Sequence, residues 1–133
     1  MERPLKLRPA LVGAALLAAA PVLAHHGWTG YRSEDFALSG TVESATLGNP
    51  HGLVKVRAED GRVWDAVLGP PGHQRRAGLT EALVPAGATV KAEGHRHLDP
   101  NRPEMKTERL TVNGRVFDIY PERVGARPGP GRT

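Results

Sequence analysis

The chain has 133 residues, of which 39% are hydrophobic and 24% are charged, and its formal net charge is +4 at pH 7. This length is enough for one domain with a modest core. The small positive charge does not predict a nucleic-acid partner. Cysteine is absent, which excludes disulfides, thiol catalysis and thiolate metal sites.

The start of the chain has the three regions of a secretory signal peptide. Basic residues precede an apolar run over residues 10–20, and Ala24 supplies a small residue at the cleavage position. The run is too short to span a bilayer, which takes about 20 residues. We therefore expect residues 1–24 to be removed, which leaves a periplasmic protein that begins at His25 and has no transmembrane span.

The remainder of the chain has the sequence pattern of an all-β protein. Residues 25–36 show no clear hydrophobic period and contain two glycines, so they predict an arm that leads into the domain. From Ala37 onward, short alternating segments are separated by turn residues such as Asp60-Gly61 and Asn113-Gly114. The expected strands are residues 38–47, 53–58, 62–68, 88–97, 105–112 and 115–120.

One helix is expected, over residues 73–84, where Leu79 and Leu83 have helical spacing. Three strands, a short helix and two or three further strands are the order of an OB-type barrel. We therefore predict an all-β fold with one short helix, a small OB-like barrel of five or six strands over residues 37–120. A small β-sandwich is the alternative. Residues 121–133 are rich in glycine, proline and arginine and predict a disordered tail.

No catalytic signature is visible. The sequence has no Gly-x-Ser-x-Gly nucleophile elbow, no phosphate-binding glycine loop and no His-Glu-x-x-His motif. Its carboxylates stand beside basic residues, and no general acid–base pair is evident. The sequence therefore favours a binding protein over an enzyme.

Histidines are the main candidates for a site. All six follow residue 24, and imidazole is the commonest metal ligand in proteins. Removal of the leader would free the α-amine of His25. That amine and the ring Nδ1 could together chelate one metal ion, and copper(II) competes best for such a site. His26, or a histidine from a distant loop, would complete the coordination.

Two histidines further along the chain are possible partners. His51 lies in the connection between the first two strands, which in an OB-type barrel flanks the ligand-binding face. His95 lies near the end of the fourth strand, and strand alternation places His97 on the same side, which we expect to be exposed. A polar strand end explains this pair equally well. The predicted metal ligands are His25, His26, His51 and His95, and the predicted metal is copper.

Two alternatives to simple metal binding stay open. The barrel could hold an envelope oligosaccharide, a lipid headgroup or a protein partner through basic residues and an aromatic side chain. The basic residues in question are Lys55, Arg57, Arg75 and Arg76. Trp28 and Tyr31 could fasten the arm to the barrel or form an aromatic floor for a flat ligand, whereas Trp64 is expected in the core. The other alternative is a copper-dependent oxidative enzyme, which also needs an open coordination position.

Several motifs resemble those of a known family. They are Ala24-His25-His26-Gly27-Trp28 with Tyr31, Gly40-Thr41-Val42, Asn49-Pro50-His51 and Gly94-His95. From about residue 24 to residue 120 the chain is similar to small exported bacterial proteins of domain-of-unknown-function family 6152. The resemblance implies a periplasmic, β-rich single domain with histidines at positions 25, 26, 51 and 95. It implies no established activity, and Gly27 stands where typical members have serine.

Overall fold

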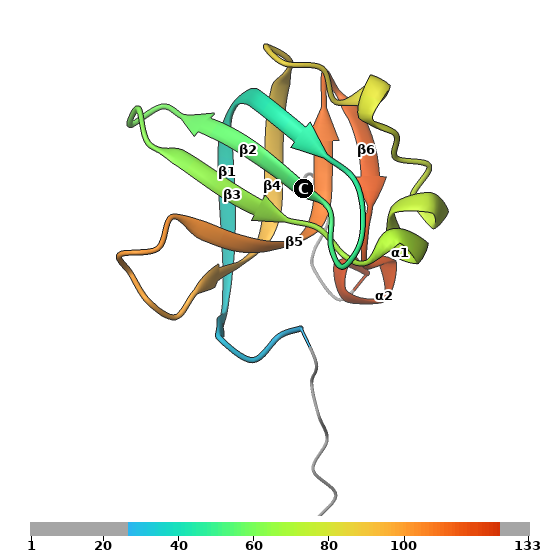
Figure 1. Cartoon of the computed structure of the whole chain (residues 1–133). Helices are drawn as coiled ribbons and strands as arrows, with labels where there is room; N and C mark the ends of the chain where they lie inside the picture. The colour runs from blue at the N-terminus through green and yellow to red at the C-terminus, as the bar shows by residue number, and fades with distance from the viewer. Residues whose placement is uncertain (1–26, 126–133) are drawn as a thin grey trace, which may run out of the picture.

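The computed structural model describes residues 27–125 (Figure 1). The predicted signal peptide, His25, His26 and residues 126–133 of the predicted tail lie outside this range. The elements in chain order are β1 (Tyr31–Thr46), β2 (Leu53–Ala58), β3 (Val63–Val67), α1 (Pro71–Arg76), the 3-10 turn η1 (Glu81–Leu83), β4 (Thr89–His97), β5 (Glu104–Val112), β6 (Arg115–Asp118) and α2 (Pro121–Val124). No helix in the described range is long and apolar enough to cross a membrane.

The strands form one sheet that closes on itself. Its order is β3-β2-β1-β4-β5-β6 with antiparallel neighbours, and β3 also pairs with β5 in parallel. This second pairing closes β1 to β5 into a ring, to which β6 is added along β5. The chain passes from β3 to β4 through α1 and η1, which lie at one side of the barrel in Figure 1. The predicted all-β fold with an OB-like barrel is confirmed.

Strand alternation fills the barrel. In β2, Val54 and Val56 are fully buried while Lys55 and Arg57 are exposed. Trp64 in β3 is 4% exposed, which confirms its expected place in the core. A fully buried valine, leucine or phenylalanine side chain stabilises a domain by roughly 1.5–3 kcal/mol relative to the same side chain left exposed. The barrel therefore needs no cysteine cross-link to hold its strands together.

The long strand β1 bends so that it can pair with both of its neighbours. Its register shifts between Val42 and Ser44 against β2, and between Tyr31 and Asp35 against β4. A Cβ atom at Gly40 would overlap the carbonyl oxygen of Arg57. Glycine is therefore required at this position, where the backbones of β1 and β2 approach most closely.

Two predicted boundaries differ in the structure. β1 begins at Tyr31 rather than at residue 38, because the polar end of the predicted arm pairs with β4, with Asp35 opposite His95. The expected helix over residues 73–84 is two separate pieces. Gly78, at φ +73°, has left the right-handed helical region and separates α1 from η1.

The beginning of the predicted tail is also ordered. Residues 121–124 form α2, so this part of the prediction of disorder is wrong. Pro121 occupies the first turn, where its missing N–H costs no hydrogen bond. Val124 is buried, and this contact with the barrel explains why so short a helix is stable.

Candidate functional site

A polar cluster lies on the outer side of β4 and β5, beneath the turn that begins at Gly27 and beside α2. Its members, called the outer cluster below, are Trp28, His95, Lys106, Glu108, Tyr120 and Arg123. His95 and Lys106 are direct neighbours across the β4–β5 ladder. The indole ring of Trp28 stands edge-on to His95, with 5.7 Å between ring centroids, and to Tyr120, with 5.0 Å. Trp28 thus fastens the arm to the barrel, one of its two predicted roles.

Both ring nitrogens of His95 are engaged. Nδ1 lies 3.0 Å from the carbonyl oxygen of Glu34, and Nε2 lies 2.8 Å from Oε1 of Glu108. A carbonyl oxygen can only accept, so Nδ1 carries a hydrogen and donates it, while Nε2 and Oε1 share a proton. A metal ion could bind His95 only after one of these hydrogen bonds is broken.

The expected exposure of His95 is wrong, since the residue is only 9% exposed. Strand alternation does place it on the outer side of the barrel, together with His97. At His95, however, Trp28 covers that side. Further along β4, His97 is less buried; its Nδ1 accepts a hydrogen bond from the backbone N–H of Asp99 at 3.0 Å.

Glu108 owes its position to a β-bulge. The β4–β5 register shifts between Glu93, opposite Arg109, and Gly94, opposite Thr107, so Glu108 is the extra residue of β5. A bulge redirects a side chain that regular alternation would place elsewhere. The Glu108 side chain is only 2% exposed. In addition to its contact with His95, its Oε1 atom lies 3.6 Å from Nη1 of Arg123. Sequence reasoning missed Glu108, because a charge in Lys-Thr-Glu-Arg is typical of a solvated strand.

Lys106 is buried without a hydrogen bond to its ammonium group among the described residues. It is 2% exposed, and Nζ lies 5.8 Å from the ring centroids of both Trp28 and Tyr120. Burial lowers the pKa of Lys106, and the charge of Glu104 opposes this shift only partly. A Cβ atom placed on Gly27 would lie 3.7 Å from Nζ. The first described residue therefore lies directly beside this amine.

The four predicted metal ligands have different positions. His25 and His26 lie outside the described residues, and His95 lies in the outer cluster. His51 is exposed in the connection between β1 and β2. Burial lowers the pKa of His51, and the charge of Lys106 lowers it further. The amine of Lys106, which lies beside Gly27, therefore also acts electrostatically on His51. Within residues 27–125, no group of three histidine, aspartate or glutamate side chains could hold a metal ion.

The basic residues predicted to hold a non-metal ligand are partly compensated. Nζ of Lys55 lies 2.7 Å from a carboxylate oxygen of Asp65, and Nε of Arg57 lies 2.5 Å from one of Glu43. Both pairs lie on the outside of the barrel. Because a carboxylate already accompanies each cation, this surface has little excess charge for an anionic headgroup.

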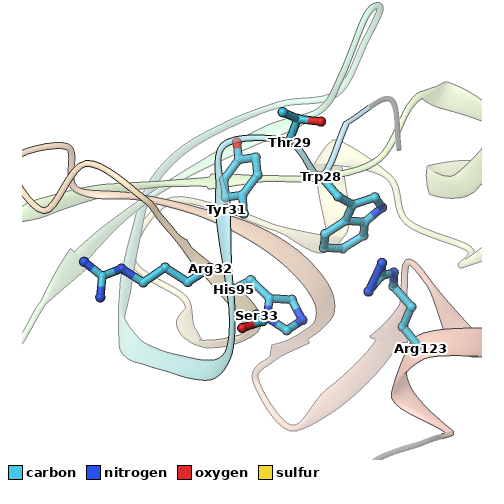
Figure 2. A pocket seen from close by; sticks show the side chains of 7 residues that line it. All are labelled: Trp28, Thr29, Tyr31, Arg32, Ser33, His95 and Arg123. Atoms are coloured by element: carbon cyan, nitrogen blue, oxygen red, sulfur yellow. The ribbon is translucent and has the colours of Figure 1, made fainter. Parts of the chain in front are cut away.

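An open pocket of about 430 Å³ lies next to the outer cluster. It is called the Trp28 pocket below, and its lining residues are Trp28, Thr29, Tyr31, Arg32, Ser33, His95 and Arg123. In Figure 2, Trp28 and Arg123 face each other at one side, His95 and Ser33 lie between, and Arg32 points away at the other side. None of the lining side chains is acidic.

Tyr31 links this pocket to Glu104 on β5. Its hydroxyl donates to Oε1 at 2.5 Å, and Nη2 of Arg102 donates to Oε2 at 2.6 Å. Burial alone would raise the pKa of Glu104, but the hydrogen bonds from Tyr31 and Arg102 bring it below its ordinary value. Burial and the bond to Glu104 raise the pKa of Tyr31. Tyr31 therefore fastens the start of β1 across the barrel surface.

The lowered pKa of Glu104 predicts an acid-sensitive contribution to stability. A carboxylate with a depressed folded-state pKa stabilises the fold above its unfolded pKa, and that stability is lost as pH falls through the folded value. Between about pH 5 and pH 3, we expect the free energy of unfolding to fall by about 1 kcal/mol less in Glu104→Gln than in the wild type. Urea unfolding across this range would measure the difference. Glu59→Gln, in an exposed turn, should follow the wild-type profile; parallel profiles for all three proteins would contradict the prediction.

These features define a small OB-like barrel domain with a buried polar cluster on its outer surface. The chain belongs to a family of unknown function, DUF6152, whose model matches residues 14–106. No curated protein and no solved structure matches the chain significantly. The family match includes His25, His26, His51 and His95, whereas Glu108 and the residues of α2 lie beyond it.

Proposed function

We propose that this chain is an exported, periplasmic protein that binds copper(II) at its mature N-terminus. The ligands in this proposal are the α-amine and ring of His25, the ring of His26 and the ring of His51. The observation that carries it is that Gly27 lies beside the amine of Lys106, whose charge also acts on His51. His25 precedes Gly27 by two residues, which span about 7 Å when extended. In this proposal the freed terminus therefore lies near Lys106 and reaches His51 on the same side of the barrel.

The state of His51 supports this assignment. Within the described residues its ring makes no hydrogen bond, and burial together with Lys106 favours its neutral form. Neutral imidazole is the form that binds a metal ion. His95, which we also predicted as a ligand, is engaged by Glu34 and Glu108. In this proposal it instead holds Trp28, and with it the beginning of the arm, against the barrel.

The decisive experiment compares two N-termini. Protein that begins at His25 should bind Cu(II) at least tenfold more tightly than the same protein acetylated at its α-amine, because acetylation removes the terminal amine from the chelate. Calorimetric titration against a competing chelator would measure this ratio, and the electron paramagnetic resonance spectrum would report nitrogen ligation. Equally weak binding by both forms would refute the terminal site.

A matched pair of histidine variants tests the contribution of His51. His51→Ala should weaken Cu(II) binding about tenfold in protein that begins at His25. His97→Gln should leave binding unchanged, because His97 packs against Tyr31 and is not among the proposed ligands. If both variants bind copper as the wild type does, His51 is not a ligand.

A further inference from the structure

We infer that the Trp28 pocket binds a small organic anion, a carboxylate or phosphate attached to a flat apolar group. The lining residues of this pocket include none of the proposed copper ligands. Three observations carry the inference: the state of Arg123, the charge balance around the pocket, and the aromatic side chains in its wall.

Arg123 has the properties of an anion-binding arginine. Its guanidinium carbon lies 3.8 Å from the centroid of the Trp28 ring, so the indole holds the guanidinium in place. Within the described residues this guanidinium makes no hydrogen bond, and its ion pair with Glu108 is long, at 3.6 Å. A planar guanidinium with unused N–H groups fits a carboxylate or phosphate in a two-pronged hydrogen bond.

The charges around the pocket favour an anion over a cation. Two of the nearby carboxylates are already engaged, Glu108 by His95 and Glu104 by Tyr31 and Arg102. Lys106 adds a buried positive charge behind Trp28. Arg32 also lines the pocket, but its guanidinium points away and lies 3.5 Å from the carbonyl oxygen of Leu98. An anion beside Arg123 would therefore meet the positive charges of Arg123 and Lys106.

The rest of the wall suits a flat, partly apolar molecule. Trp28 and Tyr31 supply aromatic surface, and the hydroxyl groups of Thr29 and Ser33 supply hydrogen-bond donors and acceptors. The volume of about 430 Å³ is within the range of small-molecule sites. Figure 2 shows the anchoring group, Arg123, next to the indole rather than across the pocket from it. The anionic group would thus lie near Arg123 and the apolar part between Trp28 and Tyr31.

The test uses benzoate and benzamide as probes, which have the same shape but differ in charge. Metal-free protein in EDTA would be titrated with each, and binding followed by the NMR shift of the Trp28 indole N–H. Benzoate should bind at least tenfold more tightly than benzamide. Phenyl phosphate, titrated in parallel, tells whether carboxylate or phosphate is the preferred anionic group. Equal affinity for benzoate and benzamide, or no shift at Trp28 with either anion at tens of millimolar, would overturn the inference.

Two variants of Ser33 test the site without disturbing the core, because Ser33 is exposed. Ser33→Glu should bind benzoate about tenfold more weakly than Ser33→Gln, because the two side chains have nearly the same size and only the glutamate repels the anion. Arg75→Gln, an exposed basic residue on α1, should have no effect. If Ser33→Glu and Ser33→Gln bind benzoate equally, or if Arg75→Gln weakens binding as much as Ser33→Glu, the anion does not bind in this pocket.

Discussion

Replacement of His95 by leucine should lower the free energy of unfolding by about 3 kcal/mol. The imidazole is the 2.8 Å partner of Glu108, whose side chain is 2% exposed. Loss of His95 removes this hydrogen bond from a carboxylate that stays buried, and loss of a hydrogen bond to a buried carboxylate is costly. Leucine has a similar volume, so the cost reports lost polar contacts more than a cavity. Urea unfolding at pH 7 would measure it.

A second substitution separates this cause from general disruption of packing. In the double variant His95→Leu/Glu108→Met, the buried carboxylate is gone as well, and the double variant should be more stable than His95→Leu alone. A loss below about 1 kcal/mol for His95→Leu, or a double variant no more stable than the single one, would contradict the role given to the His95–Glu108 pair.

Replacement of Lys106 by methionine should raise the free energy of unfolding by about 2 kcal/mol, which is a large gain for a domain of this size. The ammonium group is buried and has no hydrogen bond among the described residues. A methionine side chain is nearly as long as that of lysine and keeps favourable contacts with the rings of Trp28 and Tyr120. Thermal and urea unfolding at pH 7 would measure the gain.

The pH dependence of this gain has a definite sign. Burial lowers the pKa of Lys106 in the folded protein, so the folded state holds the proton less well than the unfolded state does. The advantage of Lys106→Met is therefore complete below the folded pKa of Lys106 and shrinks as pH rises from that pKa toward the unfolded value of about 10.4. Lys55→Met, which breaks an exposed ion pair with Asp65, should give no gain. A Lys106→Met protein no more stable than the wild type would show that the amine is well solvated.

Stabilising substitutions often reduce function. If Lys106→Met stabilises the fold, we therefore expect the charge of Lys106 to serve ligand binding. The Lys106→Met variant should then bind benzoate less well than the wild type does, since the pocket loses a positive charge. The pKa of His51 should rise in the same variant, although burial still holds it below the ordinary value. Both changes can be followed by NMR in the sample used for the stability measurement.

Much of the barrel is predictable from local sequence. β2 has the expected bounds, and β4 and β5 begin within one residue of expectation, because clear turns separate the strands. Buried and exposed side chains alternate in β2 and in the first half of β4. The first part of β1 is not predictable in this way. Tyr31 to Phe36 is polar and lacks alternation, and it becomes a strand only through pairing with β4. Long-range pairing leaves no local pattern to detect.

The site is predictable only in part. Trp28, Tyr31 and His95 are recognisable as candidates from their residue types, and the structure brings Trp28 and His95 together. Lys106 and Arg123 are not recognisable, because one stands in a charged run and the other in an apparent tail. Their positions depend on the covering of β5 by Trp28 and on the docking of α2. Both are tertiary features that the spacing of residues does not encode.

The parallel pairing of β3 with β5 also governs how molecules of this protein can associate. In the closed ring, each of β1 to β5 has a neighbouring strand on both sides over part of its length. Strand addition between molecules is the common route to aggregation of open sheets, and β6 pairs with only one described strand, β5, which leaves its outer edge open. That edge is four residues long, Arg115–Asp118, and includes the exposed Val116. At high concentration, we expect pairing of sheets between copies to use this short strand.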